Sequence, residues 1–155
     1  MQLNGKTVWV TGASSGIGEA LCEQLAAKGA TLILSARNEE KLNALNARLG
    51  GNHHVVALDL AKPEALLEDM PAVIERLGRI DVLINNGGVS QRSLFLENEF
   101  TVYRQLMEVN YFGLIALTKS EVHFTVCVNG IFITYLKYIT KVFTSFRVLH
   151  NIKLI

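Results

Sequence analysis

The hydrophobic positions of residues 1–120 follow two alternating patterns. Short apolar runs of the kind found in buried parallel strands occur four times, at residues 6–12, 30–36, 53–60 and 80–86. Segments whose apolar residues recur at helical spacing separate or follow them, at residues 16–29, 37–51, 63–77 and 98–119. Strands that alternate with helices predict an α/β fold, a doubly wound parallel sheet with helices on both faces.

Capping residues and prolines refine two of these helices. Asn38 is a predicted N-cap of the second helix, and Glu39 and Glu40 suit the positive end of its dipole. Pro63 suits the start of the third helix. We expect Pro71 to kink or split that helix, because proline cannot donate the backbone hydrogen bond of a helix interior.

Residues 121–155 have a different composition. They contain no Ala, Asp or Pro, a single acidic residue, Glu121, and six of the chain's twelve aromatic residues. We therefore divide the chain into residues 1–120 and an atypical hydrophobic segment, 121–155. Asn129-Gly130 favours a hairpin turn within that segment, although a segment without regular structure is equally compatible with it. A further hypothesis pairs part of residues 125–134 with the open edge of the strand at 80–86.

Charge and cysteine content exclude some functions. A formal charge of +1 argues against a general binder of nucleic acid. Polar residues interrupt the apolar stretch 122–139, so a membrane span is not favoured. Cys22 and Cys127 have no metal or redox spacing and no signal peptide precedes the first strand, which predicts reduced thiols in the cytoplasm. His53 and His54 have no carboxylate or thiol at ligand spacing, so we interpret them as strand-end residues and predict no metal site.

The stretch TGASSGIG at residues 11–18 lies between the first predicted strand and the first helix. Gly12 allows a tight exit from the strand, Gly16 permits phosphates to approach the backbone, and Gly18 permits close packing of helix on strand. Ser14, Ser15 and Ile17 complete the loop. The free N–H groups and positive dipole of the helix N-terminus favour a pyrophosphate there, although a glycine turn also joins strand to helix without any ligand.

Four motifs in this order resemble the short-chain dehydrogenase/reductase family over residues 1–120. They are the glycine loop at 11–18, Asp59-Leu60, Asn85-Asn86-Gly87-Gly88 (with Gly87 where the family has Ala), and Asn110. Residues 35–42 and 84–93 are most similar to the family's member 7 type. The resemblance implies a Rossmann-like half-domain with strand order 3-2-1-4.

The resemblance also implies cofactor contacts. Asp59 would accept a hydrogen bond from the adenine amino group, Leu60 would help hold the ring, and residues 86–88 (Asn86, Gly87 and Gly88) would pass the ribose. Taken alone, Asp59 would sooner be interpreted as a helix-capping or turn residue, and residues 86–88 as an ordinary strand-end turn. At the end of the second strand, Ser35 and Arg37 stand where NAD-binding proteins carry a carboxylate, which predicts NADP(H).

The family's proton donor has no counterpart in this sequence. The family uses a Tyr with a Lys four residues later and a Ser on the preceding strand, and no Tyr here has Lys at that spacing. Asn110, which would hold a water of the proton relay, is the remnant of the catalytic set; alone, it is also readable as a helix-kink residue.

We therefore expect an NADP-dependent oxidoreductase by descent, acting on a small carbonyl or secondary alcohol, truncated and catalytically impaired. The alternatives are a nucleotide-binding module without turnover and a non-functional frameshifted product. The sequence leaves the substrate and the oligomeric state open.

Overall fold

The computed structural model describes residues 2–92, 94–125 and 131–134. Within them, a parallel sheet has the strand order β3-β2-β1-β4-β5. The strands are β1 (Thr7–Thr11), β2 (Thr31–Ala36), β3 (His54–Ala57), β4 (Val82–Asn85) and β5 (Ile131–Thr134). The predicted α/β fold and the order 3-2-1-4 are confirmed, and β5 extends the sheet beyond β4.

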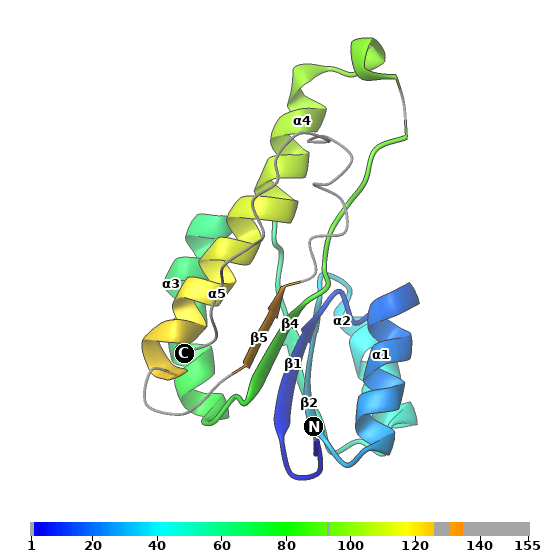
Figure 1. The fold of residues 1–155 in the computed structure, drawn as a ribbon, viewed down its shortest axis with the longest axis vertical. Coiled ribbons are helices and arrows are strands. Elements are labelled where there is room, and N and C mark those ends of the chain that lie inside the picture. The colour runs from blue at the N-terminus through cyan, green and yellow to red at the C-terminus, as the bar shows by residue number, and fades with distance from the viewer. Residues whose placement is uncertain (1, 93, 126–130, 135–155) are drawn as a thin grey trace.

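Helices cover both faces of the sheet (Figure 1). One face carries α1 (Gly16–Ala27) and α2 (Glu39–Arg48); the other carries α3 (Pro63–Leu77) and α5 (Gly113–Thr125). Side chains of a strand alternate between faces, so Val8 and Val10 join the core under α1 and α2, whereas Trp9 joins the core under α3 and α5. The central strand β1 is therefore apolar on both faces, as its sequence predicted.

The helix predictions that concern single residues have different outcomes, and Pro63 begins α3 as predicted. The Asn38 side chain accepts a hydrogen bond from Lys41 N at 2.9 Å, which confirms the predicted N-cap. The predicted split of the third helix at Pro71 is wrong, because α3 runs without a break from Pro63 to Leu77. Its buried apolar stripe, which includes Met70 and Ile74, packs against the core on either side of the proline and keeps the two halves in one helix.

The helix predicted over residues 98–119 differs from the one observed. It consists of α4 (Phe100–Met107), a π-helical turn, η2 (Glu108–Phe112), and α5, which continues to Thr125; a short 3₁₀ turn, η1 (Phe95–Glu97), precedes it. In Figure 1, α4 extends past the sheet. No glycine or proline interrupts residues 114–125, so the helix continues beyond its predicted end.

This extension changes the interpretation of the C-terminal segment. Phe124 and Thr125 are helical, so the hairpin arm that would include them is wrong, and the proposed turn at 129–130 lies outside the described residues. The hypothesis of a replacement strand is confirmed for Ile131–Thr134. It pairs in parallel with β4, with Val82 opposite Ile131 and Asn85 opposite Thr134.

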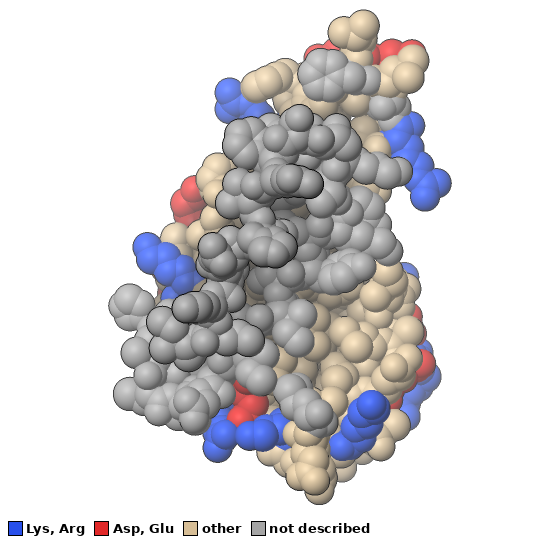
Figure 2. All heavy atoms as spheres, viewed as in Figure 1, with Lys and Arg blue, Asp and Glu red and all other residues tan. Residues whose placement is uncertain are grey.

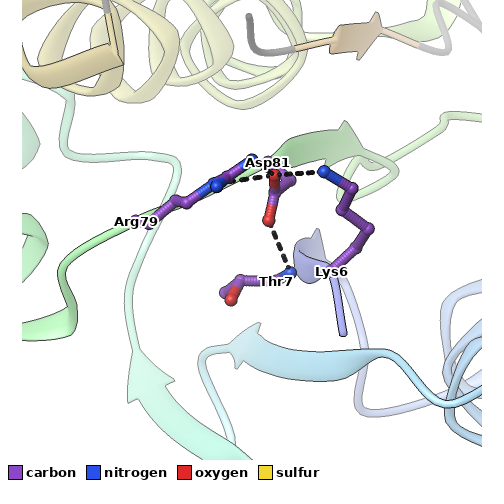
Figure 3. Close-up of polar contacts among 4 residues, drawn as sticks. All are labelled: Lys6, Thr7, Arg79 and Asp81. Carbon is purple, nitrogen blue, oxygen red and sulfur yellow. Dashed lines mark hydrogen bonds and ion pairs between the residues drawn. The ribbon is translucent and has the colours of Figure 1, made fainter. Parts of the chain in front are cut away.

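A carboxylate ties the amino ends of β1 and β4 together (Figure 3). Asp81, with a side chain 6% exposed, accepts hydrogen bonds from Thr7 N and Lys6 Nζ, each at 3.0 Å, and from Arg79 Nε at 2.9 Å. Burial alone would raise the pKa of Asp81, but these donors together hold that pKa below its ordinary value. The amino edge of the sheet is thus fixed by a charged cluster.

Cys22 is a buried core residue, and His53 accepts a hydrogen bond from the backbone of β2. Cys22 is fully buried on α1, and this burial, with Glu19 and Glu23 nearby, raises the pKa of its thiol to about 12. His53 Nδ1 accepts a hydrogen bond from Leu32 N at 3.2 Å, at the start of the β2–β3 pairing. Across the described residues there is no cluster of side chains suited to a metal ion.

Charges and helix lengths add two observations on the surface. On the face seen in Figure 2, the described Lys and Arg side chains lie scattered and do not gather in one patch. Among the described helices, none is both long enough and apolar enough to cross a membrane.

Candidate cofactor-binding site

A cavity of about 820 Å³ lies along the carboxyl edge of the sheet, where the loops after β1, β2, β3 and β4 meet. In open parallel sheets this edge is the usual place for a ligand. The cavity is lined by Gly12, Ser14, Ser15, Ile17, Ala36, Arg37, Asn38, Leu58, Asp59, Leu60, Asn86, Gly87, Gly88, Val89, Val109, Asn110 and Leu114.

Two glycines shape the loop between β1 and α1. Gly12 has a φ of +69°, which L side chains rarely adopt, and a Cβ there would lie 2.8 Å from Gly87 Cα. A Cβ on Gly18 would lie only 2.1 Å from the carbonyl oxygen of Gly12. The loop, the first turn of α1 and the strand β4 end therefore pack backbone against backbone. Gly16 has open space around it.

Thr11 connects this loop to the residues that follow β4. Its hydroxyl oxygen accepts hydrogen bonds from Asn86 N at 3.0 Å and Gly87 N at 2.8 Å. The Asn86 side chain in turn donates to Thr11 O at 3.0 Å. These bonds fix the turn at residues 86–88 to the glycine loop, so the two walls of the cavity are one hydrogen-bonded unit.

The end of β2 supplies the cationic wall. Arg37 is exposed and lines the cavity, and within the described residues no hydrogen bond or ion pair joins its side chain to another group. Ser35 does not share this position. It is fully buried and accepts a hydrogen bond from Trp9 Nε1 at 2.8 Å, so its expected direct part in cofactor choice is wrong: strand alternation points its hydroxyl into the core.

Asp59 and Leu60 follow β3 and line the cavity side by side. Asp59 Oδ1 accepts a hydrogen bond from Ala61 N at 3.0 Å, the turn contact that was its alternative interpretation. Leu60 is largely buried, and its side chain lies next to Gly87, where a Cβ would meet Leu60 Cδ1 at 2.8 Å. The glycine at position 87 thus leaves room for the leucine.

Asn110 lies in the π-helical turn η2 and holds the segment after β4. Its Oδ1 accepts from Val89 N and its Nδ2 donates to Val89 O, both at 2.8 Å. Three residues later, a Cβ on Gly113 would lie 2.1 Å from the carbonyl oxygen of Leu60. The turn therefore brings the helix against the site. The contacts of Asn110 agree with its interpretation as a residue that satisfies backbone groups.

The structure brings nearly all the predicted site residues to one cavity. Gly16, Gly18 and Ser35 are the exceptions, since the two glycines shape the loop without lining the space and Ser35 is buried in the core. Sequence reasoning missed Ala36, Asn38, Leu58, Val89, Val109 and Leu114. Leu114 was detectable as the residue one helical turn after Asn110, whereas Val109 lies within the π turn, which the sequence analysis did not predict.

These features fit a dinucleotide. The glycine contacts leave a backbone floor on which phosphates can lie close to N–H groups at the start of α1, where Ser15, the N-cap, makes no side-chain capping bond. Arg37, whose side chain has no hydrogen bond or ion pair with another described residue, lines the cavity together with the apolar residues Leu60 and Val109. The fold is thus that of an α/β protein of the Rossmann type, with a cavity at the edge where such sheets usually bind their ligands.

Comparison with known proteins identifies the family. The family model for short chain dehydrogenases matches residues 6–126. The chain therefore belongs to the short chain dehydrogenase family, a family of oxidoreductases, as its four motifs indicated. The match also includes residues 121–126, the first part of the segment whose composition differs.

Individual relatives support this membership. Human dehydrogenase/reductase SDR family member 7 is 45% identical in an alignment of 125 residues that covers 76% of this chain and 37% of the relative. The chain thus spans a little over a third of that relative's length. A short chain dehydrogenase from Shigella flexneri complexed with NADP superposes with a TM-score of 0.79 at 27% identity, over 86% of this chain and 59% of that one. A short chain dehydrogenase from Escherichia coli complexed with NADPH superposes with a TM-score of 0.77 at 29% identity. This match covers 86% of this chain and 59% of that one.

Proposed function

We propose that the chain binds NADP(H) along the carboxyl edge of its sheet. The observation that carries this proposal is the cavity itself, in which the glycine loop, Asp59-Leu60, residues 86–88 and an unpaired Arg37 line one space. The complexes of the Shigella flexneri and Escherichia coli relatives with NADP and NADPH support the choice of cofactor.

Each wall has a part in binding. The N–H groups at the start of α1, with Ser14 and Ser15, hold the pyrophosphate. Asp59 accepts from the adenine amino group through a carboxylate oxygen, and Leu60 packs on the ring. The backbone of residues 86–88 lies close to the ribose of the cofactor. Arg37 pairs with the 2′-phosphate, because a guanidinium offers a planar set of donors that matches phosphate oxygens.

Turnover is a separate matter. Bound nicotinamide supplies or accepts a hydride, and a carbonyl substrate then requires a proton at its oxygen. No Tyr in this sequence is followed four residues later by Lys, and both polar atoms of the Asn110 side chain are engaged with Val89. We infer that this chain alone reduces a carbonyl or oxidises a secondary alcohol about 10² to 10⁴ times more slowly than a relative that carries the Tyr–Lys pair, or not at all.

The first test is a fluorescence titration of the purified chain with NADPH and, in parallel, NADH. We expect saturable NADPH binding that Arg37→Ala weakens about tenfold or more, with little change for NADH, because only NADPH carries the 2′-phosphate. Lys41→Ala, which removes an exposed cation one turn further along α2, is the matched control. Absence of NADPH binding by the folded chain would refute the proposal.

A single-turnover assay distinguishes the binding module from an active dehydrogenase. The NADPH-loaded chain is mixed with a panel of small ketones and aldehydes, and loss of absorbance of the reduced nicotinamide is followed. Oxidation of the cofactor at a rate typical of the family would show that another group supplies the proton.

The predicted cytoplasmic location stays a proposal, which cell fractionation of the natural protein would test.

A further inference from the structure

A buried hydrogen bond joins β1 to β2 beneath the cofactor cavity. Trp9 Nε1 donates to Ser35 Oγ at 2.8 Å, and both residues are fully buried. Trp9 is directly opposite Ile33 in the strand register, so the indole reaches diagonally, two residues toward the carboxyl end of β2. Its ring belongs to the same apolar cluster as Leu58 and Leu60, which line the cavity.

Ser35 is a junction between the two walls that a dinucleotide would touch. Its carbonyl oxygen accepts a hydrogen bond from Ala13 N at 3.0 Å, in the glycine loop. It also pairs with Thr11 of β1 and Val56 of β3 in the sheet. Arg37 follows two residues later, at the rim of the cavity. The position of Ser35 therefore fixes where Arg37 leaves the sheet relative to the glycine loop.

We propose that Trp9 and Ser35 are positioning residues for cofactor discrimination: their hydrogen bond holds the end of β2 so that Arg37 faces the 2′-phosphate of NADP(H). This inference rests on the proposed function. Neither side chain lines the cavity, so both act through Arg37 and the backbone at Ala13 and Ala36.

The physical reason lies in the geometry of a charge-assisted hydrogen bond. A guanidinium–phosphate pair requires matched donors and acceptors, and its strength falls steeply when alignment is lost. If Ser35 loses its buried donor, its hydroxyl must find another partner in the core, and the strand end shifts with it. NADH, which has no 2′-phosphate, is insensitive to such a shift of Arg37.

The test compares the dissociation constants of NADPH and NADH for the full chain and its variants. Trp9→Phe keeps an aromatic ring without the donor, and Ser35→Ala removes the acceptor. We expect each variant to weaken NADPH binding about tenfold and NADH binding less than about twofold. Ser120→Ala is the matched control: it removes another buried serine hydroxyl, which donates to Ala116 O, away from the cavity.

A double-mutant comparison separates positioning from general destabilisation. In an Arg37→Ala background, Trp9→Phe should no longer change the ratio of the two dissociation constants, because the group that it positions is gone. Equal losses for NADPH and NADH, or an unchanged effect of Trp9→Phe without Arg37, would overturn the inference while leaving the proposed function intact. Failure of the folded wild-type chain to bind NADPH would overturn both.

Hydrogen exchange provides a readout that does not need a cofactor. In Trp9→Phe and Ser35→Ala we expect faster exchange of the amides of Ala13 and residues 36–38. In Ser120→Ala we expect no change at those amides. Exchange in the two variants that is indistinguishable from wild type at residues 13 and 36–38 would show that the bond does not hold the strand end, and would overturn the inference.

Discussion

At the residue scale, the site depends on glycines, whose lack of a side chain lets two segments of backbone come into contact. Gly12, Gly18 and Gly113 each bring one segment of backbone against another at distances that a Cβ would not permit. The walls of the cavity are therefore built from main-chain atoms, and side chains such as Arg37 are added at the rim. The hydrogen bonds of Thr11 and Asn110 also end on the main chain.

Gly18→Ala tests this arrangement. In a helix, alanine is ordinarily favoured over glycine by about 1 kcal/mol. Here the added Cβ would meet Gly12 O at 2.1 Å, so we expect a net loss of about 1–3 kcal/mol in the free energy of unfolding, together with loss of NADPH binding. Urea denaturation measures the first effect and titration the second. Gln24→Ala, on the exposed side of α1, should leave both unchanged; a stabilised Gly18→Ala variant would contradict the contact.

At the element scale, the two edges of the sheet have different functions. The carboxyl edge carries the cavity, whereas the amino edge carries the cluster of Asp81 with Lys6, Arg79 and Thr7 N. This cluster orders the start of β4 against the start of β1, and the same two strands deliver Thr11 and Asn86 to the site at their other ends. Strand register set at one edge is thus transmitted to the other.

The Asp81 cluster predicts a dependence of stability on pH. Because the folded-state pKa of Asp81 is lowered, the cluster stabilises the fold fully above the unfolded pKa of about 4 and loses that contribution as the pH falls through the folded pKa. We expect Asp81→Asn to cost about 1–3 kcal/mol at pH 7 and to flatten the acid limb of the stability curve. Urea denaturation from pH 7 to pH 3 checks this, with Asp69→Asn, exposed on α3, as the control. An acid limb that is the same in both variants would refute the role of Asp81.

Sequence patterns predicted the elements better than their junctions. Apolar runs and helical periodicity predicted β1 to β4 and the first three helices, and the residue type predicted the Asn38 N-cap. These features depend on residues that are close together in the sequence. The π turn at Glu108–Phe112 is followed by Gly113, which lies against the distant Leu60 carbonyl, a contact that periodicity does not contain. The partner of the buried Ser35 hydroxyl is likewise distant in the sequence, since it is Trp9, 26 positions away.

At the scale of the whole molecule, the important feature is the edge of the sheet at β4. An apolar parallel strand such as β4 is a hazard when its edge is open, because its unpaired N–H and C=O groups can recruit another chain. In this structure Ile131–Thr134 covers that edge in parallel register with Val82–Asn85. The segment with the unusual composition thus has a part in the fold, independent of any part in chemistry.

Proline substitution tests the β4–β5 pairing. Successive N–H groups of a strand point to opposite sides, so of Phe132→Pro and Ile133→Pro, made separately, one removes a bond to β4 and the other does not. We expect one variant to lose about 1 kcal/mol or more in the free energy of unfolding and the other to stay close to wild type. The destabilised variant should also aggregate more when it is concentrated, which light scattering measures. Two variants equally like wild type would contradict the pairing.

The bonds from Thr11 and Asn110 to main-chain atoms have a consequence for how the family can diversify. A hydrogen bond to the N–H and C=O of residue 89 is the same whether that residue is valine or another amino acid, so Asn110 constrains the path of the chain and not the identity of the residue that it holds. Val89 lines the cavity all the same. Evolution can therefore exchange this side chain, and with it the shape offered to a ligand, while the scaffold around it keeps its geometry.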